Sequence, residues 1–150
     1  AMQIILWRHA EAEDVASGGD LARVLTKRGR KQAERMGEWL RERLDDDWRV
    51  IASPAKRAVQ TAKGLGREFE EREALAPGAS AAAILREAGW PEARHSVVIV
   101  GHQPTLGEAA ARILGVRSDI GIRKGAIWWF ARKGEETLLR CVLDPELLER

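Results

Sequence analysis

The feature that most constrains this chain is an apolar run near its N-terminus that stops abruptly on two polar residues. Residues 4–7 are apolar, and Arg8 and His9 follow them directly. A continuous apolar run of this length is typical of a strand buried on both faces of a parallel sheet. In open α/β sheets, ligands bind at the carboxyl ends of such strands, where loops and helix N-termini hold polar groups. The sequence therefore predicts that Arg8 and His9 lie at a ligand-binding edge.

A second apolar run ends in the same way. Residues 97–100 are all apolar and lead through Gly101 into His102. Since the carboxyl ends of parallel strands meet at one edge of a sheet, we expect His102 to lie near His9. His95 precedes its strand, so it is expected at the opposite edge.

A third, shorter strand is predicted at residues 49–52, ending at Ser53. The residues that follow favour a helix from 55 to about 69, with Arg57 in its first turn. Arg57 would then join Arg8 and the two histidines at the same edge of the sheet.

The remaining elements follow from the spacing of apolar residues and from helix-capping and turn residues. Helices are predicted over residues 26–44, 79–88 and 104–114, and strands over 126–131 and 138–143, joined by a hairpin turn at 133–136. Residues 12–20 are small, acidic and glycine-containing, which is typical of a mobile loop, and we expect this loop to lie over the strand ends. The predicted fold is a single α/β domain spanning residues 1–150. It has three layers: a mostly parallel sheet, helices on both of its faces and right-handed crossovers, with an antiparallel C-terminal hairpin.

Composition narrows the classes of ligand. The chain has 25 basic and 23 acidic residues, and most of the basic ones are arginine, which suits an anionic ligand without requiring one. No basic block indicates nucleic-acid binding, and no apolar run approaches the ~20 residues of a membrane span. Cys141 is the only cysteine, which excludes an internal disulfide and fits a reducing compartment. We expect a cytoplasmic protein.

The residues expected at the sheet edge suit phosphoryl transfer. The guanidinium groups of Arg8 and Arg57 match phosphoryl oxygens, and a neutral imidazole supplies a nucleophilic nitrogen. Phosphoryl transfer needs mainly positioning and charge neutralisation, which this set offers without a metal. A histidine at one strand end can also be purely structural, but two of them together with two arginines favour a functional site.

Four blocks of sequence resemble one known family. They are Leu-Trp-Arg-His-Ala-Glu at 6–11, Arg-Val-Leu-Thr at 23–26 with Gly29, Ser-Pro-Ala-Lys-Arg-Ala-Val-Gln-Thr at 53–61, and Val-Gly-His-Gln-Pro at 100–104. In this order they resemble the histidine phosphatase superfamily, whose fold is phosphoglycerate mutase-like, and most closely its bacterial phosphohistidine phosphatase branch, SixA. The resemblance covers nearly the whole chain.

The resemblance implies a role for each matched residue. His9 would be the nucleophile, and Arg8, Arg57 and His102 would bind the phosphoryl group and stabilise its transfer. Arg23 would line the pocket as a further basic residue. No cofactor and no metal are implied.

The chain departs from the wider superfamily at two points. Ala10 stands where glycine is common, so the turn after the nucleophile must be one that alanine accepts. The general acid is not marked by a motif; Glu71 and Glu73 are the candidates, of which Glu73 is the possible acid.

The resemblance also predicts the substrate. The chain between residues 61 and 97 is too short for the cap found in larger relatives, so we expect an open pocket that admits phosphohistidine on a partner protein, such as a phosphotransfer domain or phosphocarrier. The alternatives are a phosphatase of a small phosphometabolite, a phosphate-binding module without turnover, and a metal-dependent hydrolase using Glu11, Glu13 or Asp14. The oligomeric state is left open.

Overall fold

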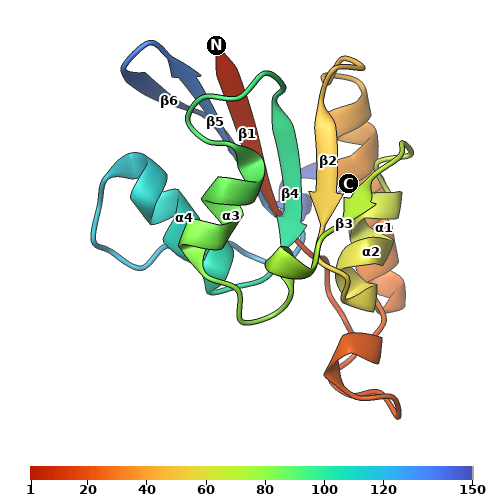
Figure 1. Ribbon diagram of the computed structural model, residues 1–150. Coiled ribbons are helices and arrows are strands. Elements are labelled where there is room, and N and C mark those ends of the chain that lie inside the picture. Colours follow the sequence, from red (N-terminus) through yellow and green to blue (C-terminus); the bar gives the residue numbers. More distant parts are fainter. Residues whose placement is uncertain (150) are drawn as a thin grey trace.

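The two apolar runs of the sequence lie side by side at the centre of a six-stranded sheet. A computed structural model of the protein describes residues 1–149. Strand β1 (Met2–Arg8) pairs in parallel with β4 (Val97–Gly101). The register places Arg8 opposite Gly101, so both strands end at the same level. In Figure 1 the carboxyl ends of β1, β2 and β4 all point downward.

The sheet is mixed, as the sequence predicts. Its strand order is β3-β2-β4-β1-β5-β6. Strands β2 (Arg49–Ala52) and β3 (Glu70–Glu71) extend the parallel half beside β4. On the other side, β5 (Ile127–Lys133) runs antiparallel to β1 and forms a hairpin with β6 (Glu136–Leu143).

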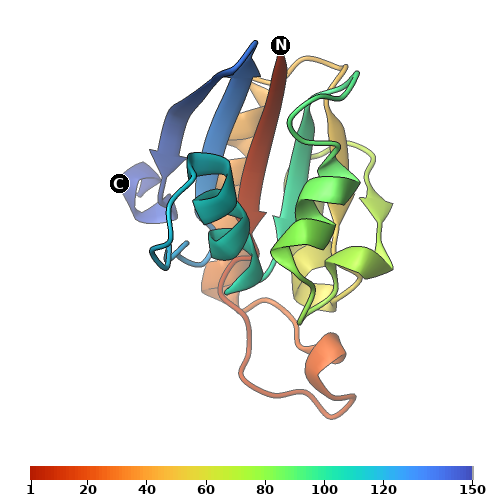
Figure 2. The same ribbon diagram turned by 60° about the vertical axis from the view of Figure 1, so that its left-hand side comes forward.

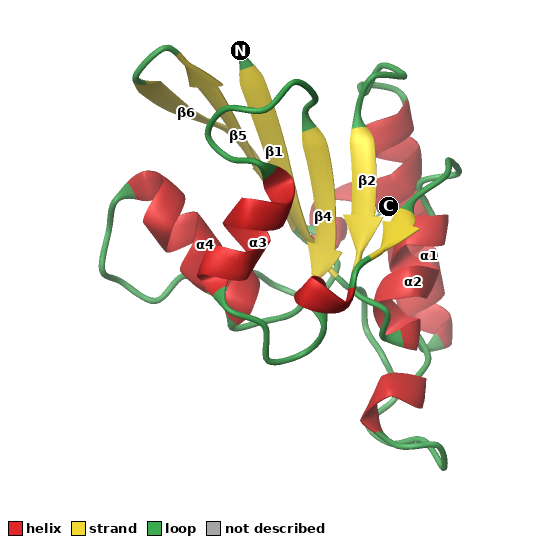
Figure 3. Ribbon diagram, in the orientation of Figure 1, coloured by secondary structure: helices red, strands yellow, loops and turns green. Residues whose placement is uncertain are grey.

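Two pairs of helices cover the two faces of the sheet (Figures 1 and 3). Helices α1 (Lys27–Arg41) and α2 (Lys56–Lys63) lie on one face, and α3 (Ala81–Ala88) and α4 (Thr105–Leu114) on the other. Short 3-10 segments are η1 (Asp20–Ala22), η2 (Glu73–Leu75) and η3 (Pro145–Leu148). None of the helices within residues 1–149 is long and apolar enough to cross a membrane.

The alternation of side chains along β1 divides the core in two. Ile5 and Trp7 pack toward α1 and α2, whereas Ile4 and Leu6 pack toward α3 and α4. All four side chains are fully buried, because successive residues of a strand point to opposite faces and both faces are covered. This burial explains the unbroken apolar run that precedes Arg8.

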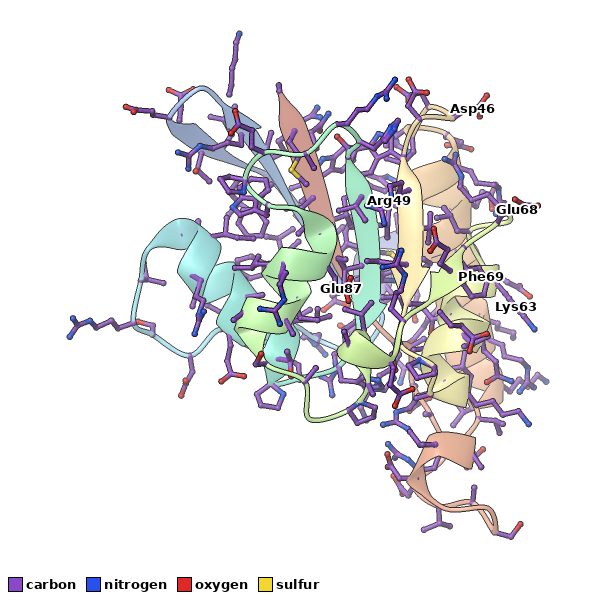
Figure 4. The ribbon with its side chains drawn as sticks, in the orientation of Figure 1. Asp46, Arg49, Lys63, Glu68, Phe69 and Glu87 are labelled. Atoms are coloured by element: carbon purple, nitrogen blue, oxygen red, sulfur yellow. The ribbon has the colours of Figure 1, made fainter. Side chains whose placement is uncertain are left out.

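The second helix is shorter than the sequence predicts. It ends at Lys63 instead of near residue 69, because the chain turns at Gly64 and then adopts a left-handed conformation at Gly66, with φ of 71°. The residues beyond it turn back toward the sheet, where Phe69 packs against the core and the unpredicted strand β3 begins (Figure 4).

Close packing of α1 on α2 explains why glycine stands at the contact. A Cβ atom at Gly37 would overlap the backbone carbonyl of Gly64, so the two helices approach there without side chains between them.

The other predicted elements agree with the structure to within a few residues. At the start of α1, Thr26 caps the helix, its hydroxyl accepting a hydrogen bond from the backbone N–H of Gly29.

Candidate active site

The carboxyl ends of β1, β2 and β4 bring together residues that lie far apart in the sequence. The backbone N–H of His9 donates to the carbonyl of Gly101, and the backbone N–H of Ser53 donates to the carbonyl of Val100. The hydrogen bonding between neighbouring strands of the sheet therefore continues just past their ends. As a result the imidazole rings of His9 and His102 lie with their centroids 5.3 Å apart. The structure thus places both histidines in one cluster.

The hydrogen bonding of His9 fixes which nitrogen is available for chemistry. Its Nδ1 lies 2.8 Å from the carbonyl oxygen of Ala10. A carbonyl can only accept, so Nδ1 carries the hydrogen and Nε2 keeps its lone pair. Burial, reinforced by the charges of Arg57 and Arg8, lowers the pKa of His9 to about 4 despite the bond to Ala10. At neutral pH the ring is therefore uncharged, which is the state in which an imidazole can act as a nucleophile.

Ala10 is accommodated without strain after the nucleophile. No residue other than glycine within residues 1–149 has a positive φ, so the turn is one that alanine accepts. The backbone N–H of Ala10 donates to Oγ1 of Thr61, which in turn donates to the carbonyl of Arg57. Thr61 therefore ties the turn after His9 to helix α2. The four-residue spacing of Arg57 and Thr61 predicts only that they share one face of the helix, and not the contact of Thr61 with Ala10.

His102 is held by a serine at the end of the neighbouring strand. Its Nε2 lies 2.8 Å from Oγ of Ser53, which also accepts a hydrogen bond from the backbone of Ala55. Burial, together with the charges of His9 and Arg57, lowers the pKa of His102 to about 3. Both imidazoles are therefore neutral at pH 7, and the positive charge of the cluster comes from its arginines.

The arginines of the cluster are short of acceptors. Arg57, in the first turn of α2, has only 4% of its surface exposed, and Nη1 of Arg8 donates to the carbonyl of Ile122. Burial lowers the pKa of Arg8 from its usual value. Among the described residues, Nε of Arg8, Nε of Arg57 and Nδ1 of His102 are buried without a hydrogen-bond partner. Such a cluster of unpaired groups calls for an anionic ligand.

Asp20, which the sequence analysis did not single out, is in direct contact with the cluster. Nη1 of Arg57 donates to the backbone carbonyl of Asp20 at 2.8 Å, and Nη2 lies 3.2 Å from its carboxylate. Nε of Arg23 lies 3.2 Å from the other carboxylate oxygen. Desolvation raises the pKa of Asp20, but the hydrogen bond and charge of Arg57 outweigh it and lower the pKa overall. Arg23 is thereby placed beside the cluster.

The predicted loop after the first strand lies beyond the strand ends, and the openness of the pocket stays a prediction. The segment between residues 61 and 97 supplies no cap, because α3 packs on α4 and on the face of the sheet. Instead the loop formed by residues 13–22, which we call the lid loop, projects beyond the strand ends (Figure 2). His9 and His102 are each only 6% exposed. The lid loop brings Asp20 into contact with Arg57 at this edge of the sheet.

The carboxylates of Glu73, Glu11, Glu13 and Asp14 make no hydrogen bond or ion pair with His9 or His102 within residues 1–149. Glu73 is exposed in η2, and its carboxylate makes none of the hydrogen bonds or ion pairs found among residues 1–149. Its role as the acid stays a prediction. Glu11 turns toward the start of α1, where its carboxylate accepts a hydrogen bond from Thr26. Within the described part of the chain, no three histidine, cysteine, aspartate or glutamate side chains gather as a metal site.

Comparisons with known proteins agree with this arrangement. The family model of the histidine phosphatase superfamily (branch 1) matches residues 4–78. A phosphohistidine phosphatase SixA homologue from Haemophilus influenzae is 33% identical over 152 aligned residues, which cover 89% of this chain and 92% of the relative.

Solved structures share the fold over nearly the whole chain. The protein histidine phosphatase SixA complexed with tungstate has a TM-score of 0.81 at 24% identity, covering 99% of this chain and 100% of the other. A phosphoserine phosphatase from Entamoeba histolytica, in complex with phosphoserine, has a TM-score of 0.76 at 16% identity, covering 99% and 100%. By its sequence match and its phosphoglycerate mutase-like fold, this chain belongs to the histidine phosphatase superfamily, in its SixA branch, and is a phosphatase.

Proposed function

We propose that this phosphatase is metal-independent, holds the phosphoryl group covalently on Nε2 of His9, and dephosphorylates phosphohistidine on a partner protein. The observation that carries the proposal is the hydrogen bond from Nδ1 of His9 to the carbonyl of Ala10. It leaves Nε2 with its lone pair, and the lowered pKa of about 4 keeps the ring neutral at the pH of a cell.

The reaction proceeds in two displacements at phosphorus. In the first, Nε2 of His9 attacks, the bond from phosphorus to the substrate imidazole breaks, and the departing nitrogen takes a proton. In the second, water attacks the phosphorylated His9, the bond to Nε2 breaks and inorganic phosphate leaves. Arg8, Arg57 and His102 hold the phosphoryl oxygens during both steps, which is the electrostatic stabilisation that phosphoryl transfer requires.

The leaving group supports phosphohistidine over an alkyl phosphate. An alkoxide has a conjugate acid of pKa about 15 and needs a proton donor, whereas imidazole has a conjugate acid of pKa about 6.5 and needs much less help. Glu73, the carboxylate that could supply the proton, is exposed in η2 and makes no hydrogen bond or ion pair within residues 1–149. The cluster is therefore better suited to a leaving group that departs without strong acid catalysis.

The relatives support the same assignment. The Haemophilus influenzae protein that aligns over most of the chain is described as a phosphohistidine phosphatase SixA homologue. The partner would present a phosphohistidine at its surface, as a phosphotransfer domain or a phosphocarrier does. The single free thiol, Cys141, fits a reducing compartment, and we place the enzyme in the cytoplasm.

A small phosphometabolite is the second candidate substrate. The phosphoserine phosphatase with phosphoserine bound shares this fold across the chain, so the same strand-end architecture accommodates a small phosphate ester in that protein. A module that binds phosphate without turnover is the third candidate, and phosphate binding without product release would identify it.

The deciding experiment measures kcat/KM for a phosphohistidine protein and for sugar phosphates and phosphoserine peptides under one set of conditions. His9→Ala serves as the blank, and each assay is repeated with EDTA. We expect a ratio well above one in favour of the phosphohistidine protein and no effect of EDTA. A ratio at or below one would favour the phosphometabolite, and selective loss of alkyl-ester turnover in Glu73→Gln would identify Glu73 as the acid.

A further inference from the structure

The carboxylate of Asp20 lies where an anionic substrate group would be drawn. One carboxylate oxygen lies 3.2 Å from Nη2 of Arg57 and the other 3.2 Å from Nε of Arg23. A carboxylate between two guanidinium groups presents negatively charged oxygens to the same donors that a phosphoryl group uses. Arg57 is almost fully buried, so it has few other directions from which to accept a second anion.

The same residue makes a second contact of a different kind. The backbone carbonyl of Asp20 accepts a hydrogen bond from Nη1 of Arg57 at 2.8 Å. This bond orients Arg57 and does not depend on the side chain at position 20. The carboxylate is 60% exposed and is free to rotate toward solvent, leaving the backbone bond in place.

We propose that Asp20 is a specificity-determining residue, whose carboxylate competes with the substrate phosphoryl group for Arg57 and Arg23. A phosphate ligand must displace this carboxylate before it reaches the arginines. The displacement weakens the binding of every phosphate ligand by the strength of the ion pairs that Asp20 gives up. The inference rests on the proposed function in taking Arg57 as a phosphoryl-binding residue.

Contacts with the lid loop can compensate a protein substrate for the free energy of displacing the Asp20 carboxylate. Two of its apolar side chains face solvent, Val15 at 82% and Leu21 at 55% exposure, and Leu21 is the immediate neighbour of Asp20. Gly19, with φ of 92° and no atoms crowding its Cβ position, allows the backbone before Asp20 to change direction. A protein that carries phosphohistidine can contact these side chains as it docks, whereas inorganic phosphate or a small ester cannot.

Binding of inorganic phosphate tests the competition directly. The variants are Asp20→Asn and Asp20→Ala, and titration calorimetry gives the dissociation constant for each. Asp14→Asn is the matched control, since Asp14 is an exposed carboxylate of the same loop and takes part in no ion pair within residues 1–149. We expect phosphate to bind about fivefold more tightly to both Asp20 variants, equivalent to about 1 kcal/mol, because one partner of the ion pair is largely exposed. Asp14→Asn should change the constant by less than about twofold, since exposed charges that make no contact are screened by salt.

The opposite results would overturn the inference. Unchanged or weaker phosphate binding in Asp20→Asn would show that the carboxylate positions Arg57 instead of competing for it. If Asp14→Asn bound phosphate more tightly by the same factor, the change would follow from the net charge of the loop and not from competition for Arg57. A misfolded protein cannot bind phosphate more tightly, so a failure to fold would not be mistaken for support. A thermal melt of each variant identifies such a failure. If one Asp20 variant does not fold, phosphate binding by the other tests the inference.

A kinetic measurement extends the test to substrates. Removal of the carboxylate should raise kcat/KM for a small phosphate ester by the same factor of about five, and raise it less for a phosphohistidine protein. The selectivity for the protein should therefore fall in Asp20→Asn. Phosphate binding does not require turnover, so an enzyme inactive toward every phosphohistidine protein would refute the proposed function without deciding the role of Asp20.

Discussion

The imidazole rings of His9 and His102 lie with their centroids 5.3 Å apart and tilted by 57° to one another. Each ring is buried, and a positive charge on one would face Arg57 and the other ring. This arrangement explains why the pKa of both histidines lies well below the usual value, at about 4 and about 3. Both rings are therefore neutral at pH 7, as the proposed roles of His9 as nucleophile and of His102 as a hydrogen-bonding partner of the phosphoryl group require.

Replacing the nucleophile should separate chemistry from binding. In His9→Ala we expect phosphatase turnover to be abolished, because the variant lacks the nitrogen that we propose attacks phosphorus. Binding of phosphate or tungstate should remain measurable by calorimetry, since Arg8, Arg57, Arg23 and His102 still provide charge and hydrogen bonds. Turnover near the wild-type rate would show that His9 is not the nucleophile.

The covalent intermediate should be trapped by a rapid quench. After brief labelling with a radioactive substrate, we expect phosphate on His9 that survives base and is lost in acid, because a phosphoramidate is base-stable and acid-labile. Peptide mapping should locate the label at residue 9, and His9→Ala should carry none. A label with the reverse stability would indicate an acyl phosphate on a carboxylate.

Arg57 should contribute to both binding and rate. Arg57→Ala removes a buried guanidinium that we propose contacts the phosphoryl group, and such a charged contact is worth about 1.5–3 kcal/mol, or ~10- to 150-fold in kcat/KM. Arg57→Lys should recover only part of this, because an ammonium lacks the two-pronged geometry. Lys56→Ala, an exposed neighbour on the same turn, is the matched control and should stay within about twofold.

Stability should depend on pH through the buried histidines. Unfolding returns each imidazole to a pKa of about 6.5, whereas His9 in the folded protein has a pKa of about 4. Between these values the unfolded chain binds more protons, so the free energy of unfolding falls as the pH is lowered from ~6.5 toward 4 and is insensitive to this group above ~6.5. Urea titrations at several pH values measure this slope.

The variant His9→Ala tests whether His9 causes part of this dependence of the unfolding free energy on pH. In His9→Ala the fall between pH 6.5 and 4 should be shallower than in the wild type, because one of the two titrating groups is gone. Parallel slopes in His9→Ala and the wild type would contradict the burial of a neutral ring at position 9.

The contact between α1 and α2 should not tolerate a methyl group. In Gly37→Ala the new Cβ meets the carbonyl of Gly64, and we expect a loss of about 1–3 kcal/mol of unfolding free energy, as for other overpacked interiors. Gly121→Ala is the control, since a Cβ at position 121 meets no atom within 4 Å and its backbone conformation is not left-handed. Denaturation by urea compares the two. Equal stabilities would show that the helices can move apart at no cost.

Much of the site could be predicted from local sequence patterns. The runs at residues 4–7 and 97–100 are apolar on both faces because both faces of the central strands are covered, and this property is visible in the residues themselves. Once two such strands are parallel, their carboxyl ends must share an edge, which is why the meeting of Arg8, His9 and His102 could be expected. Local chemistry likewise predicted the start of α1 at the Thr26 cap.

Only the tertiary structure decided what surrounds these residues. The contact of Arg57 with Asp20 spans 37 residues, and that of Ala10 with Thr61 spans 51. Neither has a periodic pattern, because such a contact depends on how the lid loop and α2 are placed by the crossovers between strands. The early end of α2 has both kinds of cause, since the left-handed conformation at Gly66 is a local preference of glycine, whereas Gly64 is needed for close approach to α1. Apolar burial follows from residue type and spacing, and both can be read from the sequence. A single polar contact between a loop and a helix depends on a distance in three dimensions, which the sequence does not contain.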